Sequence, residues 1–133
     1  MADIAVAVRN RLVANAPLVA KVATRIYPVN RPQDSLLPAI RYIVISDNGE
    51  EHLKGQGGPF TARIQFDAFS KSYLETREIA RLLTVALPGP VVDGTIQIGR
   101  VLWDRPNDGG DDTTGGYIHR ARVDLLVEYA VLA

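Results

Sequence analysis

The sequence contains no cysteine. This absence excludes disulfide bonds, thiolate metal ligands and cysteine nucleophiles together, and it fits assembly inside a cell. Long apolar runs are also missing, since no stretch approaches the roughly 18 residues that a membrane-spanning helix requires. The first residues lack the basic segment that begins a secretory signal peptide. We therefore expect a protein that is made and kept in the cytoplasm.

Net charge is absent as well, because fifteen basic and fifteen acidic residues cancel. A protein that binds nucleic acid over a broad surface needs an excess of basic residues. The composition of this chain is therefore compatible only with a local basic patch. Hydrophobic residues make up 47% of the chain and charged residues 23%, values close to those of ordinary globular proteins. At 133 residues we expect one domain, 1–133, large enough to bury its own core.

The segment 61–87 carries the two clearest patterns of the sequence. Polar and apolar residues alternate strictly over 61–68, which is typical of a strand with one buried face. Ser72 and Glu75 then have the Ser-x-x-Glu spacing of a capping box, which begins a helix. Apolar residues recur at helical spacing as far as Leu87. A strand that leads into an amphipathic helix indicates an α+β domain.

Two short helices are predicted before this segment. Asp3 is placed to cap a helix over 4–15, and Pro17 suits the first turn of a second helix that ends near residue 23. The next segment, 25–38, holds three prolines and predicts an extended surface connection that begins with a short edge strand. Further strands are indicated by β-branched residues or by alternation at 39–46, 95–103 and 117–131.

These elements predict a single α+β domain. Its sheet is expected to be mostly antiparallel, with four strands or slightly more, packed by the N-terminal helix pair and one longer central helix. The two remaining segments, 47–59 and 104–116, are polar and rich in glycine and are predicted as long exposed loops. Loops of this length are uncommon unless they are functional or disordered, so we expect partners to be met there.

No catalytic constellation is visible in the sequence. His52 has no second histidine four residues later, as a helical zinc motif requires, and the aspartates of 104–116 lack EF-hand spacing. The glycines of 55–58 lead into a strand, whereas phosphate-binding loops lead into a helix. We predict a structural protein without enzyme activity, cofactor or metal. The alternative is a small metal-dependent hydrolase, motivated only by the aspartates near one histidine: Asp108, Asp111, Asp112 and His119.

Four stretches in this order resemble one family. They are Val-Ala-Thr-Arg-Ile-Tyr-Pro at 22–28, Leu-Pro-Ala-Ile at 37–40, Arg-Ile-Gln-Phe-Asp-Ala-Phe-Ser at 63–70 and Arg-Ala-Arg-Val-Asp-Leu-Leu-Val-Glu-Tyr at 120–129. Taken together over nearly the full length, they resemble the tail-completion or tail-terminator proteins of long-tailed bacteriophages and gene transfer agents.

The resemblance implies a structural virion protein. In that family, six copies form a ring that caps the tail tube at its head-proximal end, stops its polymerisation and supplies the surface for head–tail joining. The implied partners are further copies of the chain, the major tail tube protein and the head–tail connector, with assembly in the host cytoplasm. DNA only passes through the lumen, and neither a membrane nor a cofactor is implied. The alternative within this class is a head-side connector or neck protein.

The polar faces of the predicted strands are the candidate contacts between subunits. We choose them because the sequence shows no active site to which the function could be assigned. The candidate interface residues are Arg63, Gln65, Asp67, Arg120, Arg122, Asp124 and Glu128. A solvated face is the alternative interpretation of the same pattern. The candidates for a surface that faces the lumen or the tube lie in the two predicted loops: Glu50, Glu51, His52, Lys54, Asp108, Asp111 and Asp112.

Overall fold

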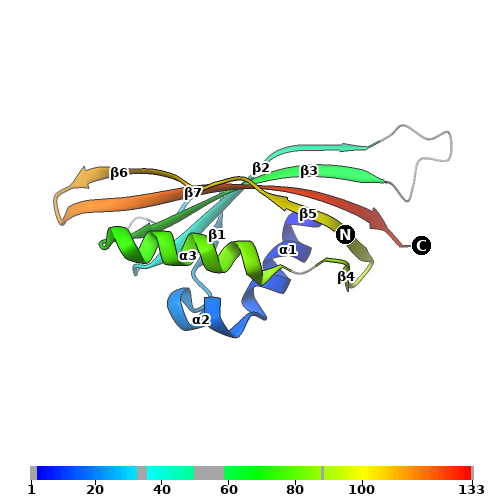
Figure 1. Cartoon of the computed structure of the whole chain (residues 1–133), viewed down its shortest axis with the longest axis horizontal. Coiled ribbons are helices and arrows are strands. Elements are labelled where there is room, and N and C mark those ends of the chain that lie inside the picture. The colour runs from blue at the N-terminus through cyan, green and yellow to red at the C-terminus, as the bar shows by residue number, and fades with distance from the viewer. Residues whose placement is uncertain (1–2, 33–35, 50–58, 88, 133) are drawn as a thin grey trace.

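The computed structural model describes residues 3–32, 36–49, 59–87 and 89–132. Over these ranges the chain forms three helices and one sheet of seven strands (Figure 1). The helices are α1 (Ile4–Val13), α2 (Ala16–Val22) and α3 (Tyr73–Ala86). The strands are β1 (Ile26–Pro28), β2 (Ala39–Gly49), β3 (Phe60–Ser70), β4 (Val91–Asp93), β5 (Ile96–Trp103), β6 (Asn107–Thr113) and β7 (Gly116–Val131). No helix of the described ranges has the length and apolarity needed to cross a bilayer.

The helix starts follow the predicted caps. The Asp3 carboxylate accepts hydrogen bonds from the backbone N–H groups of Ala5, at 2.7 Å, and Val6, at 3.2 Å. At α3, the Ser72 hydroxyl accepts from the Glu75 N–H at 3.3 Å, which confirms half of the capping box. In a capping box the Glu75 carboxylate would accept from the Ser72 N–H. Here Ser70 lies between them: its Oγ accepts from the Ser72 N–H and donates to Glu75 Oε1 at 2.5 Å.

The sheet corrects the predicted fold class. Its strand order is β1-β2-β3-β7-β5-β4, with β6 paired to β7 as well, and it curls into a half-barrel. Because β1 runs parallel to β2 while the other pairs are antiparallel, the sheet is mixed. The prediction of a mostly antiparallel, four-stranded sheet is therefore wrong. The prediction did not include β4 and β6. It also did not foresee the parallel pairing of β1, a three-residue strand whose direction is set by its contact with β2.

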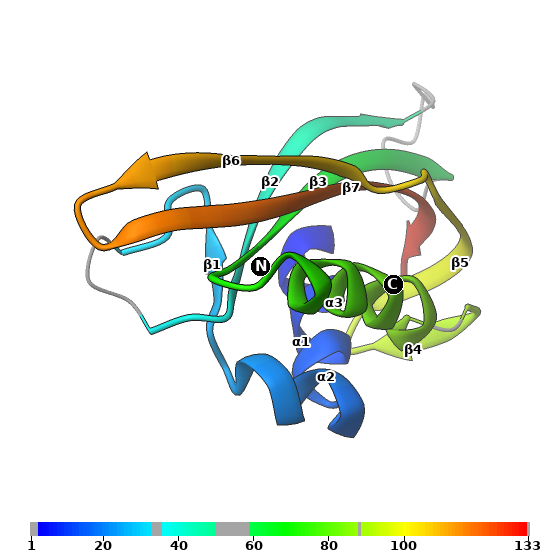
Figure 2. The same ribbon diagram turned by 60° about the vertical axis from the view of Figure 1, so that its left-hand side comes forward.

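The segment 104–116 is mostly a strand, where a loop was predicted. Strand β6 forms a hairpin with the first half of β7, which we call the arm (residues 107–122), and the arm extends beyond the helices (Figures 1 and 2). The glycines of β6 make room for side chains of β7. A Cβ at Gly109 would lie 2.3 Å from Arg120 Nη2, and one at Gly110 would lie 2.6 Å from the Tyr117 ring. Close approach of neighbouring groups is a common reason for glycine within a strand.

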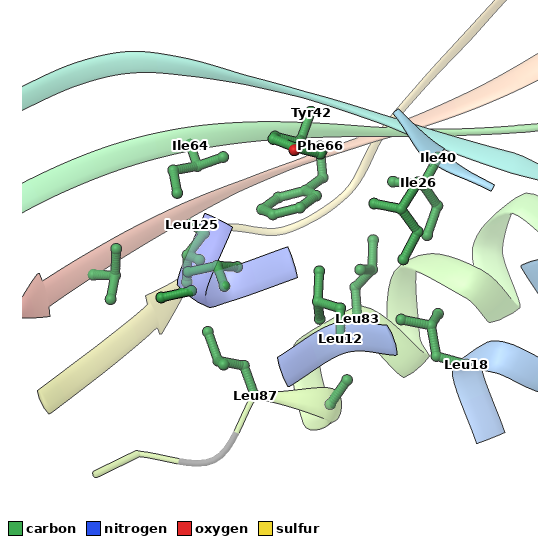
Figure 3. Packing of buried hydrophobic residues seen from close by; sticks show 14 of the residues in the cluster. Leu12, Leu18, Ile26, Ile40, Tyr42, Ile64, Phe66, Leu83, Leu87 and Leu125 are labelled. Atoms are coloured by element: carbon green, nitrogen blue, oxygen red, sulfur yellow. The ribbon is translucent and has the colours of Figure 1, made fainter. Parts of the chain in front are cut away.

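The core lies between the concave face of the sheet and the three helices (Figure 3). Alternate residues of β3 and β7 point inward, as the sequence pattern predicted. Phe66 is 1% exposed at the middle of this face, and its ring centroid lies 6.0 Å from that of Tyr42 and 5.6 Å from that of Trp103. The same side chain thus joins β2, β3 and β5, and the opposite, outer face of the sheet is left for other contacts.

Candidate interaction surfaces

All seven candidate interface residues lie on the outer face of β3 and β7, opposite the helices. The register places Arg41 of β2, Asp67 of β3 and Arg122 of β7 side by side across three strands. Arg122 Nε donates to Asp67 Oδ1 at 2.9 Å, and Arg41 Nε donates to Asp67 Oδ2 at 3.1 Å. The Asp67 side chain is only 1% exposed. This carboxylate is therefore already bound within its own chain.

A second ion-pair group lies further along the outer face. Arg63 Nη1 donates to Asp124 Oδ2 at 3.0 Å and to Asp104 Oδ2 at 3.4 Å. Arg63 and Asp124 are adjacent diagonally on paired strands, and Asp104 follows β5. These side chains are a quarter or more exposed, so the pair contributes little to stability. Much of the predicted polar face is thus paired inside one chain.

Two of the seven candidates have no ion pair or side-chain hydrogen bond in the described part of the chain: Arg120, which is half-buried, and Glu128, which is exposed. The third remaining candidate, Gln65, donates from Nε2 to Asp67 Oδ2 at 3.3 Å. The Arg120 guanidinium lies over Gly109, which holds the side chain against the arm. The outer face therefore offers Glu128 and Arg120 as unpaired charges, rather than the full set that the alternation indicated.

The loop candidates have two different outcomes. Glu50, Glu51, His52 and Lys54 lie outside the residues that the structure describes. The aspartates of the second segment lie on the arm instead of a loop: Asp108, Asp111 and Asp112.

Asp108 ties the arm to α3. Its carboxylate accepts from Arg77 Nη1 at 3.2 Å and from the Tyr73 hydroxyl at 3.3 Å. Tyr73 and Arg77 are four residues apart on α3, so they lie on one side of the helix. Neither was predicted as a site residue, because the sequence alone did not place β6 beside α3. These contacts join the arm to the helix that covers the sheet, but the side chains of Arg77 and Asp108 are 41% and 44% exposed, so the pair adds little stability.

The four residues of the alternative hydrolase do not gather at one point. Asp111 pairs with Ile118 and Asp112 with Tyr117, so successive aspartates point to opposite faces of the arm. His119 packs edge-on against the rings of Tyr73 and Tyr117. Within the described ranges, no group of three or more histidine or acidic side chains is arranged to hold a metal ion.

A groove of about 380 Å³ lies between the C-terminal half of α3 and β5. Its lining includes Thr84, Gly89, Pro90, Arg100, Val101 and Trp103. Arg81 lies one helical turn before Thr84, and Arg105 follows Trp103 by two residues. Arg81, Arg100 and Arg105 are all exposed, and none of them has an ion pair among the described residues. We call this surface, with its three arginines, the arginine groove.

Tyr129 provides a pH-dependent contact between β7 and β2. Burial raises the pKa of Tyr129, and so does the hydrogen bond that its hydroxyl donates to Asp47 Oδ1 at 2.6 Å. The Tyr129 hydroxyl therefore keeps its proton in the folded chain at pH values where the unfolded chain loses it. The stability that the hydroxyl contributes is fully present below about pH 10, the ordinary pKa of tyrosine, and is lost as the pH rises above it.

We expect the Tyr129→Phe variant to lose less stability than the parent between pH 9 and 11, since it has no phenol to ionise. Urea unfolding of both proteins across this range measures the difference. Parallel pH profiles for the two proteins would contradict the prediction. At pH 7 the variant is expected to be about 1 kcal/mol less stable, because one hydrogen bond is lost.

The fold has a relative among solved structures. No model of a protein family matches the sequence, and no curated protein matches it. One chain of the structure titled "Virion of native gene transfer agent (GTA) particle" shares the fold with a TM-score of 0.66 and 15% sequence identity. The alignment covers 94% of this chain and 92% of that chain. The likeness shows that the two chains have the same fold.

Proposed function

We propose that this protein is a structural component of a phage-type particle, and that a ring of its copies caps the tail tube at the end that joins the head. The observation that carries the proposal is the shared fold with a chain of a gene transfer agent virion, over 94% of the chain. The order of sequence patterns that resembles tail-terminator proteins supports the same role.

The surface of the chain suits a ring. Copies in a ring use two different surfaces, one for each neighbour. The described part of the sheet has an open edge on each side. The outer edge of β6 has no paired strand, and on the other side β1 pairs with only three residues of β2. Unpaired strand edges readily join a neighbouring chain. Glu128 and Arg120 on the outer face are further candidates for contacts between copies.

The charge balance also suits a passage for DNA. Proteins that bind the phosphate backbone tightly use many lysine and arginine contacts. With equal numbers of basic and acidic residues, this chain does not present such an excess. DNA would therefore pass a ring of these chains without being held.

Deletion of the gene from its source genome tests the proposal. We expect tails of irregular or excessive length without attached heads in electron micrographs, and we expect the wild-type gene to restore normal particles. Tails of normal length with heads attached would contradict the proposed function. Tails of normal length beside closed, tail-less heads would instead place the protein on the head side, as a connector or neck protein.

A further inference from the structure

We propose that the acidic tip of the arm binds the arginine groove of a second copy of the chain. The inference rests on the proposed function, because it names the contact between neighbouring copies in the ring. It joins two surfaces of opposite charge whose charged side chains have no ion pair among the described residues.

The arm tip has the properties of an inserted element. Asp111 and Asp112 are exposed, and neither has an ion pair among the described residues. The hydrogen bonds of Asp108 connect the base of the arm to α3. The backbone pairing of β6 with β7 gives the arm a defined shape before binding, so less conformational entropy is lost when the tip meets its partner.

The arginine groove has the complementary properties. Arg100 lines a concave surface that includes Trp103. Arg81 and Arg105 are close in sequence to lining residues, one helical turn before Thr84 and two residues after Trp103, and none of the three arginines has an ion pair among the described residues. Val85, on α3 beside this surface, is 63% exposed. Aromatic residues and arginines are enriched in protein interfaces. Opposite charges across an interface favour the correct partner and orientation.

The groove cannot receive the arm of its own chain. Strand β5 pairs with the second half of β7 and β6 with the first half, so the two follow one another along the same side of β7. Trp103 is opposite Leu125, whereas Asp111 is opposite Ile118. Seven residues of strand separate these positions, which corresponds to about 23 Å. The matching charges of tip and groove can therefore meet only between two molecules.

Cysteine cross-linking tests this contact directly, because the natural chain has no cysteine. Thr114→Cys places a thiol at the exposed turn of the arm, and Thr84→Cys places one in the groove. One variant is labelled with ¹⁵N, so that mass spectrometry separates mixed dimers from dimers of one variant. We expect the mixture to form several times more mixed disulfide than a mixture of Thr114→Cys with Val6→Cys. Val6 is 53% exposed on α1 and serves as the matched control.

Charge reversal supplies the second readout. We expect Asp111→Lys with Asp112→Lys to reduce cross-linking to the control level, and Arg81→Glu, Arg100→Glu and Arg105→Glu together to do the same. Mixing the two reversed proteins, with the cysteines in place, should restore the yield, because each arm then meets a groove of opposite charge. The melting temperatures of the variants verify that they are folded.

Cross-linking at the control level, or no restoration by the reversed pair, would overturn the proposal. If the groove variant instead loses affinity for duplex DNA while cross-linking stays at the control level, the arginines hold phosphate and the proposal fails. The outcome is independent of the gene deletion. A strong cross-link in a protein whose deletion leaves tails normal would keep the contact and reject the tail role.

Discussion

Asp67→Asn is expected to lower the free energy of unfolding by about 3 kcal/mol. The wild-type carboxylate is 1% exposed and lies between the guanidinium groups of Arg41 and Arg122. Asparagine has nearly the same shape but no charge, so the variant leaves two arginines facing each other across a neutral group. The side chains of these arginines are 28% and 36% exposed and can regain water, which is why we expect the low end of the range for a broken buried pair.

Urea unfolding followed by Trp103 fluorescence measures this effect, since the chain has one tryptophan. Asp104→Asn is the matched control. It removes a carboxylate that also contacts an arginine, but its side chain is 68% exposed, so we expect a change below about 0.5 kcal/mol. Equal effects for the two variants would show that the Asp67 cluster is not buried in solution.

The burial of Asp67 makes it unsuitable for testing whether the outer face contacts other copies. Reversing the charge of Asp67 would unfold or weaken the single chain, so a loss of assembly would say nothing about contacts between copies. Glu128→Lys is the informative change, because Glu128 is exposed and has no ion pair in the described part of the chain. Arg120 is less suitable, since its side chain packs over Gly109.

Local patterns predicted the elements that carry a strong period or a cap. The alternation in β3 and β7 identified both strands and the face that each buries. The caps at Asp3 and Ser72 fixed two helix starts. These features depend on residues close together in the sequence, and so the sequence alone is enough to find them.

Features that depend on distant residues were not predictable. Gly109 and Gly110 look like loop residues until Arg120 and Tyr117 are seen to cover them across the hairpin. The alternation placed Asp67 on a polar face, but its burial follows from the arginines that the neighbouring strands bring beside it. The arginine groove has no sequence motif, because α3, β5 and the segment between them form it only in the folded chain.

Phe66→Ala is expected to have the largest effect on stability, about 4 kcal/mol. The ring is 1% exposed at the centre of the concave face and packs against Tyr42 and Trp103. Its removal leaves a cavity at a point where three strands meet, and the curled sheet has little freedom to close it. Since a domain of this kind has a total stability of roughly 5–15 kcal/mol, the loss is a large share of the whole.

Phe69→Ala is the matched comparison, three residues further along the same strand. Its ring lies on the outer face, half-buried, with Arg31 at 5.1 Å and Arg41 at 5.5 Å from the ring centroid. Cation–π contacts of this kind contribute about 1 kcal/mol, so we expect a loss near that value in urea unfolding. The pair reports the register of β3 in solution, because a shift by one residue would move Phe66 outward and Phe69 inward. A larger loss for Phe69→Ala than for Phe66→Ala would therefore contradict the register that places Asp67 between its two arginines.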